Sequence, residues 1–234
     1  MPINKKCKLI FIHIPKCGGV YITKLFDMYA NNFLHSTNNS SIPNKDCHIY
    51  GRTIQHYTIN MIQDCIHTYN IMNPLEKNIN INEYKIITII RNPYIRFISA
   101  YKQYPDRCNL LFKKMIGNKS LIEFAKYLVN RVKNEGYNFF NYGSFHQFQP
   151  MYFYIEDNNI KSNIIKLDDN DYNKNIKQLC SEYGFLYNDN HLNTNPNNSD
   201  YSEYLNNKEF INCINFIYKK DFELYNYDMI SDFN

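Results

Sequence analysis

The sequence predicts an α/β fold in which a central, mainly parallel β-sheet is flanked by helices. Two runs carry this prediction: residues 8–19 (KLIFIHIPKCGG) and residues 84–101 (YKIITIIRNPYIRFISAY). Each is a short apolar segment, rich in β-branched residues, that ends in a turn and then suits a helix, which is typical of a buried parallel strand and its crossover. No linker rich in Pro, Gly or Ser divides the chain, so we expect a single domain over residues 1–234.

The turn after the first apolar run has the composition of an anion-binding loop. Pro15 ends the strand, Gly18 and Gly19 relax the backbone, and Lys16 adds a full positive charge. Glycines let backbone amides approach an anion closely, and the N-terminus of the following helix, expected over residues 21–29, carries partial positive charge. This loop is therefore predicted to hold a phosphate or sulfate group.

The second run repeats the same design after a strand predicted over residues 86–90. Arg91 follows the strand, and Pro93 suits the first turn of a helix. Ser99 lies two helical turns beyond Arg91, so its hydroxyl can join the guanidinium in binding one cluster of oxygens. Two such sites predict a ligand with two phosphate or sulfate groups.

Apolar periodicity predicts the elements around these motifs. We expect helices over residues 58–72, 120–134, 172–183 and 208–222, and a short strand over residues 163–167. The polar, Asn- and Ser-rich residues 31–45 and the turn-rich residues 73–82 are expected to be connections. The alternation of strands and helices favours a parallel sheet over an antiparallel one.

The two motifs PKCGG and RNPYIRFISAY together resemble the nucleotide-binding motifs of sulfotransferases that use 3′-phosphoadenosine 5′-phosphosulfate (PAPS). The form HIPKxGG is most similar to the Golgi carbohydrate sulfotransferases of the heparan 2-O and chondroitin types. A weaker similarity continues through residues 146–154 and 219–228, so most of the chain is covered. The resemblance implies a P-loop-like three-layer fold and transfer of a sulfuryl group from PAPS to a carbohydrate hydroxyl, with release of 3′,5′-ADP (PAP).

By matching position, the resemblance also assigns residues to the donor. The 3′-phosphate falls to Arg91 and Ser99, and the 5′-phosphosulfate falls to the first loop. The loop residues implied are Lys16, Cys17, Gly18, Gly19, Val20 and Tyr21. The family usually carries Ser or Thr at the positions of Cys17 and Val20, so binding here is expected to rest on backbone amides and Lys16, with the thiol as a weak donor.

Transfer to a hydroxyl requires a base, and histidine is the side chain best suited to that role near neutral pH. The chain has seven histidines. His56 precedes a predicted helix between the two motifs, as in the family's pattern, and is the first candidate; His48 is the second, whereas His13 is expected to be structural. Lys16 is expected to neutralise charge on the departing phosphate oxygen. The seven cysteines show no metal-ligand spacing, and no metal is expected.

Three alternative functions remain open. A P-loop kinase also binds phosphates after a strand, but its GxxxxGK[ST] pattern is absent from this sequence. A non-catalytic nucleotide- or glycan-binding module with the same fold is favoured by Cys17 and Val20. A tyrosylprotein sulfotransferase would share the donor and accept acidic peptides.

Charge and composition restrict the partners, the cellular location and the source that we expect. The net charge of +4 and the pI of about 8.5 suit an anionic donor or glycan and fall short of a nucleic-acid binder. The apolar runs are too short to span a membrane, so we expect a soluble, cytoplasmic protein. The abundance of Asn, Ile, Lys and Tyr and the lack of Trp indicate AT-biased coding, as in a large DNA virus or an AT-rich microbe. A viral member would be found in the host cytoplasm or the virion.

Overall fold

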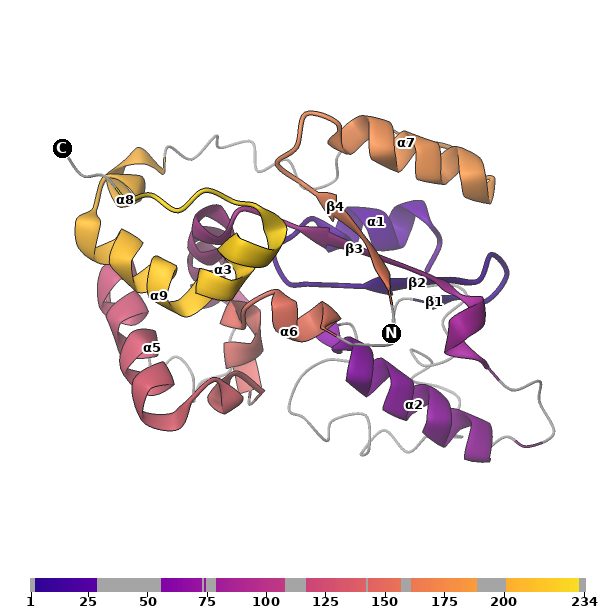
Figure 1. Ribbon diagram of the computed structural model, residues 1–234, viewed down its shortest axis with the longest axis horizontal. Coiled ribbons are helices and arrows are strands. Elements are labelled where there is room, and N and C mark those ends of the chain that lie inside the picture. The colour runs from indigo at the N-terminus through magenta and orange to yellow at the C-terminus, as the bar shows by residue number, and fades with distance from the viewer. Residues whose placement is uncertain are drawn as a thin grey trace. The chain divides into compact units, whose positions relative to one another are not determined.

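The computed structural model describes residues 3–28, 56–72, 74, 79–107, 117–141, 143–156, 161–188 and 201–231. The predicted connection 31–45 and the candidate base His48 lie outside this range. The chain divides into two compact units: Met1–Ile90 with Phe153–Thr194, and Arg91–Tyr152 with Asn195–Asn234. Figure 1 shows both units, and each is described by itself. The expectation of a single domain stays a prediction.

The first unit contains the sheet. Its strands are β1 (Ile3–Asn4), β2 (Leu9–Ile12), β3 (Lys85–Ile90) and β4 (Ser162–Lys166), in the order β1-β2-β3-β4. β2 pairs with β3 in parallel and β3 with β4 in parallel, whereas β1 is antiparallel to β2. The predicted α/β fold with a mainly parallel sheet is thus confirmed. Because the three parallel strands end at one edge, the residues that follow them emerge together there.

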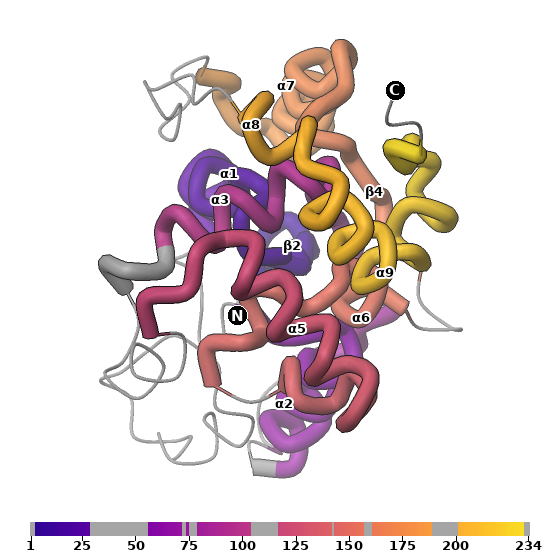
Figure 2. Tube along the Cα trace, turned by 90° about the vertical axis from the view of Figure 1, so that its left-hand side faces the viewer, coloured from indigo at the N-terminus to yellow at the C-terminus, as the bar shows by residue number. Residues whose placement is uncertain are grey.

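Three longer helices belong to this unit: α1 (Gly19–Leu25), α2 (Ile59–Met72) and α7 (Tyr172–Tyr183). In Figures 1 and 2, α1 and α7 lie above the strands and α2 lies below them. Strands β2 and β3 are apolar almost throughout and buried, as parallel strands covered by helices should be. The sequence prediction of α7 was correct at both ends, and that of α2 was one residue too long at its start.

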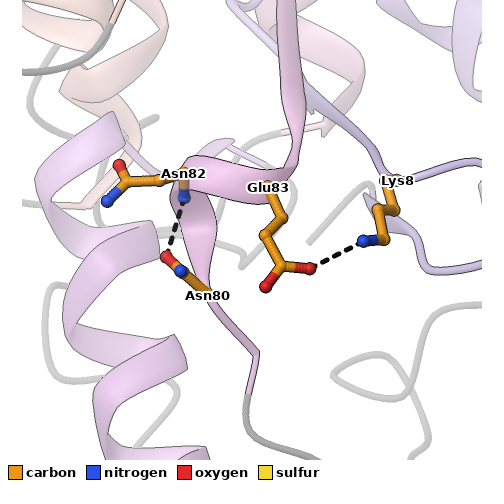
Figure 3. Close-up of polar contacts among 4 residues, drawn as sticks. All are labelled: Lys8, Asn80, Asn82 and Glu83. Atoms are coloured by element: carbon orange, nitrogen blue, oxygen red, sulfur yellow. Dashed lines mark hydrogen bonds and ion pairs between the residues drawn. The ribbon is translucent and has the colours of Figure 1, made fainter.

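Side-chain contacts fasten the amino ends of the strands. Lys8, just before β2, pairs with Glu83 at 2.6 Å from Nζ to Oε2 (Figure 3). The Lys8 carbonyl accepts from the amide of Lys85 at 2.9 Å. Asn80 accepts from the Asn82 amide at 3.1 Å and so caps the short helix η3 (Ile81–Glu83) that leads into β3. The ion pair is half exposed, so water screens the attraction between its two charges. Together with the bond from the Lys85 amide, it connects the segments at the amino ends of β2 and β3.

The second unit is helical over its described residues. Its main helices are α3 (Pro93–Arg107), α5 (Leu121–Glu135) and α9 (Lys208–Tyr225), joined by η4 (Asn138–Asn141), η5 (Gly143–Phe148) and α8 (Ser202–Leu205), with the first residue of α6 (Tyr152–Ile155) at its boundary. The core of this unit is aromatic. The ring of Phe97 lies 5.3 Å from that of Phe148 and 5.7 Å from that of Phe210, centroid to centroid. Such ring pairs add to the stabilisation from burial alone.

One buried carboxylate connects the two segments that carry the weaker family resemblance. Asp221, on α9, accepts hydrogen bonds from the amides of Met151 at 2.7 Å and Tyr152 at 2.9 Å. Burial raises the pKa of Asp221 to about 6, while these two bonds and the nearby Arg96 oppose the rise. The neighbouring Tyr218 hydroxyl donates to the Phe148 carbonyl at 2.6 Å. Phe148, Met151 and Tyr152 are thus joined to α9 within this unit.

Candidate functional site

The first motif forms a strained loop between β2 and α1. Lys16 has φ 69° and Gly18 has φ 77°, both in the left-handed region. Glycine adopts this conformation freely, but a side chain such as that of Lys16 does so at a cost of about 1 kcal/mol. Backbone strain of this kind concentrates at binding and catalytic sites, because the surrounding structure must hold it in place. Lys8, Asp27 and Asn226 also have positive φ, so it is the motif around Lys16, at the start of α1, that makes this loop the candidate site.

The start of α1 is suited to an anion. Within the part of the chain that the structure describes, no side chain caps this helix, whose N-cap residue is Gly18. The first amides of a helix lack intrahelical acceptors, so an anion bound here takes the capping role. The half-buried Lys16 adds its charge to the same loop. Binding of an anion by the motif PKCGG stays a prediction that these features agree with.

Gly19 is required by a close contact, and Gly18 is required by its conformation. A Cβ on Gly19 would lie 2.1 Å from Cδ2 and 2.3 Å from Nε2 of His13, distances that no real Cβ shows. A Cβ on Gly18 would lie 3.4 Å from Leu167, which follows β4, and Gly18 also has positive φ. The loop thus lies against residues that follow β2 and β4, the strands on either side of β3.

The other side chains of the loop contact the protein itself. The Cys17 thiol is buried and donates to the Pro15 carbonyl at 3.7 Å. The Tyr21 hydroxyl donates to the Asn188 carbonyl at 2.6 Å, and Tyr172 lies nearby, its pKa raised by burial and by Tyr21. Val20 is half-buried and has no polar atom on its side chain. An anion in this loop would accordingly be bound by backbone amides and Lys16.

The candidate base His56 contacts His13, the last residue before the loop. Its Nδ1 lies 3.1 Å from the His13 carbonyl oxygen, and the two rings meet edge to face with centroids 4.7 Å apart. Burial, reinforced by the neighbouring His56, holds the pKa of His13 well below its usual range. His13 is therefore neutral at physiological pH. Sequence reasoning classed it as structural, and no signal in the sequence indicated its contact with His56.

The second motif begins directly after β3. Asn92 Oδ1 accepts from the amides of Tyr94 at 3.0 Å and Ile95 at 3.5 Å, so it caps α3, and Pro93 occupies the first helical position. Arg91 and Ser99 are both half-buried. The cap was missed in the sequence, although Asn followed by Pro is a known start signal for a helix.

Arg96 illustrates how the same motif also serves the fold. It is 1% exposed, donates to the Gln147 carbonyl at 3.1 Å and lies over the ring of Tyr218, with 5.9 Å from Cζ to the centroid. These contacts give Arg96 a structural role within the second unit. Arg91 and Ser99 belong to the second unit and the Lys16 loop to the first, so the joint action of the two motifs stays a prediction.

Two further observations concern the described residues as a group. None of their His, Cys, Asp and Glu side chains gather in threes to form a metal site. No helix among them has the length and hydropathy to cross a membrane.

The chain matches one known protein-family model over nearly its whole length. A family model described as "Sulfotransferase family" matches residues 1–228, nearly the whole chain and both motifs. No significant match to a curated protein or to a solved structure accompanies it.

Proposed function

The chain belongs to the sulfotransferase family, and from this premise we propose that it transfers the sulfuryl group of PAPS to a hydroxyl of a carbohydrate acceptor. The observation that carries the proposal is the loop at residues 15–19. It combines a lysine in a strained conformation, a helix start without a side-chain cap and a glycine that a neighbouring ring forbids from carrying a side chain. These are properties of a site for a phosphate or sulfate group.

The donor's two anionic ends suit the two motifs in different ways. The amides at the start of α1 and the ammonium of Lys16 would bind the 5′-phosphosulfate. The Arg91 guanidinium and the Ser99 hydroxyl would bind the 3′-phosphate, because a guanidinium pairs two donors with phosphate oxygens. The family resemblance supports this division and assigns Cys17, Gly18, Gly19, Val20 and Tyr21 to the 5′-phosphosulfate. The amides of Cys17 and Tyr21 already donate to the carbonyls of Ile14 at 3.4 Å and Gly18 at 3.1 Å.

In the proposed reaction His56 is the general base and Lys16 the electrostatic stabiliser. The acceptor oxygen bonds to sulfur as the bond from sulfur to the donor's phosphate oxygen breaks, and PAP leaves. His56 takes the proton of the acceptor hydroxyl during this step. Lys16 neutralises the charge that develops on the departing phosphate oxygen, and it does so without reorganisation because the loop already holds it. His48 remains the second candidate for the general base.

The acceptor class rests on the HIPKxGG form of the first motif, which favours carbohydrate over peptide. The modest positive charge of the chain suits an anionic glycan. On composition alone, we also propose a large DNA virus or an AT-rich microbe as the source, and the cytoplasm as the location. A tyrosine-containing acidic peptide is the alternative acceptor for the same chemistry.

A second candidate function has its own support in the loop. The Cys17 thiol donates to Pro15, and Val20 carries no hydroxyl, so two donors usual in the family are missing from the anion site. A member that binds the nucleotide without turnover would tolerate this loss. Sulfate transfer from PAPS to a panel of glycans, measured with labelled sulfate, separates the two functions.

Thermal unfolding with 3′,5′-ADP, 5′-ADP and ATP, each with and without Mg²⁺, tests the donor assignment. A ligand at about 100 times its dissociation constant adds about 2.7 kcal/mol to stability. We expect selective stabilisation by 3′,5′-ADP that does not depend on Mg²⁺. Preference for ATP with Mg²⁺ would indicate a kinase, and a lack of response to all three nucleotides would overturn the donor assignment.

A further inference from the structure

His13 lies between the anion loop and the candidate base, and it contacts both. Its ring packs on Gly19, the first residue of α1, so closely that a Cβ there would overlap it at 2.1 Å. Its carbonyl oxygen lies 3.1 Å from Nδ1 of His56. Its ring also stacks on Phe11 of β2, with centroids 5.5 Å apart. One residue therefore joins the strand, the loop and His56.

The carbonyl contact determines where His56 carries its proton. A carbonyl oxygen can only accept a hydrogen bond, so the bond requires a proton on Nδ1. In the neutral ring the lone pair is then on Nε2. A base that acts through Nε2 needs this tautomer before the acceptor arrives.

The ring contact restricts how His56 can move. The His13 ring is 3% exposed, held between Phe11 and Gly19, and presents itself to the His56 ring at an interplanar angle of 66°. Burial keeps the pKa of His13 low, so it stays neutral and does not compete for the proton that His56 accepts. Because the His13 ring is buried and stays neutral, its position and charge do not change while the His56 ring gains and loses a proton.

We propose that His13 is a positioning residue. Its carbonyl oxygen fixes the tautomer of His56, and its ring fixes the orientation of the His56 ring. Its contact with Gly19 fixes the position of His56 relative to the anion loop. This inference rests on the proposed role of His56 as the base. His13 itself touches neither reacting atom in this scheme. It acts through His56 on one side and through the first turn of α1 on the other.

Nitrogen-resolved NMR of the histidine rings tests the tautomer directly and needs no variant. We expect His56 to show a protonated Nδ1 and a non-protonated Nε2 at a pH where the ring is neutral. His67, exposed on α2, is an internal reference expected to show a mixture of tautomers. A wild-type His56 protonated on Nε2 would overturn the proposal.

A double-mutant cycle tests the packing. Gly19→Ala should strongly lower the unfolding temperature, because the new Cβ overlaps the His13 ring. In a His13→Ala background the same change should have a much smaller effect, since the ring is gone. Gly184→Ala is the matched control: it introduces a side chain at positive φ with nothing within 4 Å, so its cost should be the same in both backgrounds. Equal effects of Gly19→Ala in the two backgrounds would contradict the proposal.

Kinetics then test the consequence for the reaction. His13→Ala should lower kcat by about tenfold to a hundredfold, less than the loss from His56→Ala, and leave the thermal shift by 3′,5′-ADP in place. The backbone carbonyl of residue 13 remains in this variant, so His56 should keep its proton on Nδ1, and the lower kcat would reflect the lost orientation of its ring. His13→Phe keeps a ring on Gly19 and should restore much of the kcat. A kcat unchanged in His13→Ala would overturn the positioning role.

Failure of the proposed function has a different signature. In that case the wild type would transfer no sulfate, while the NMR and the double-mutant cycle would still report whether His13 positions His56.

Discussion

The two anion motifs look alike in sequence, but the structure builds them differently. After β2, the helix α1 starts at a glycine and has no side-chain cap among the described residues. After β3, the helix α3 starts with Pro93, which has no N–H, and Asn92 takes the next two amides. The first turn can offer backbone amides to an anion. In the second turn, the amides that follow Pro93 already donate to the Asn92 side chain.

This difference implies two modes of binding. In the first motif, recognition would depend on backbone conformation and on one charge, so glycine positions and Lys16 matter most. In the second, it would depend on side chains, and Arg91 must supply the interaction that the capped helix cannot. The same strand-turn-helix pattern therefore predicts different sensitivities to substitution in the two turns.

The largest effect is expected at Lys16, where charge and strain can be separated. Lys16→Ala removes the charge and keeps the strained conformation, and Lys16→Gly removes both. We expect both variants to lose about 10²- to 10³-fold in the rate of sulfate transfer, since each lacks the stabilising charge. The unfolding free energy of Lys16→Gly should exceed that of Lys16→Ala by about 1 kcal/mol.

Steady-state kinetics and denaturant unfolding of the two Lys16 variants check this prediction. Full activity in Lys16→Gly would mean that the loop needs flexibility rather than charge. That result would leave backbone conformation as the sole basis of recognition in the first motif.

A smaller and more selective effect is expected at Arg91. Arg91→Ala should weaken binding of 3′,5′-ADP by about 10- to 100-fold and binding of 5′-AMP by less than about twofold, because only the first ligand has a 3′-phosphate. Arg91→Lys keeps the charge without the two-pronged geometry and should lie in between. Titration calorimetry with both ligands measures the difference. Equal losses for the two nucleotides would remove Arg91 from the 3′-phosphate site.

Sequence reasoning predicted the fold well where local pattern and tertiary structure agree. The apolar run ending at Ile90, the amphipathic pattern of α7 and the glycine pair of the loop each report on one short segment. Strand β1 was missed because two residues, Ile3 and Asn4, cannot show an alternation. It pairs with β2 as the antiparallel edge, a tertiary feature without a local signature.

The site was predictable only in part, for a related reason. Residue types and spacing indicate an anion loop at Lys16, but they do not reveal that the ring of His13 closes over Gly19 or that His56, 43 residues later, meets its carbonyl. Those contacts depend on how distant segments pack. They are also the contacts that turn a list of candidate residues into a testable arrangement.

The smallest effect is expected from the cap of the second motif. Asn92→Ala removes the acceptor for the Tyr94 amide and should lower the unfolding free energy by about 1 kcal/mol. Ser120→Ala is the matched control, because Ser120 caps α5 in the same unit through the Glu123 amide and should cost a similar amount. Neither change should alter the affinity for 3′,5′-ADP by more than about twofold if side chains alone bind the 3′-phosphate.

Denaturant unfolding and calorimetry on the Asn92 and Ser120 variants would decide between the two modes of binding. A rise in 3′,5′-ADP affinity in Asn92→Ala, absent in Ser120→Ala, would mean that the phosphate captures the amides released from the cap. The second turn would then bind through its backbone as the first does, and the cap would be a competitor of the ligand. Unchanged affinity would instead leave Asn92 with a purely structural role and the binding of the 3′-phosphate to side chains such as Arg91.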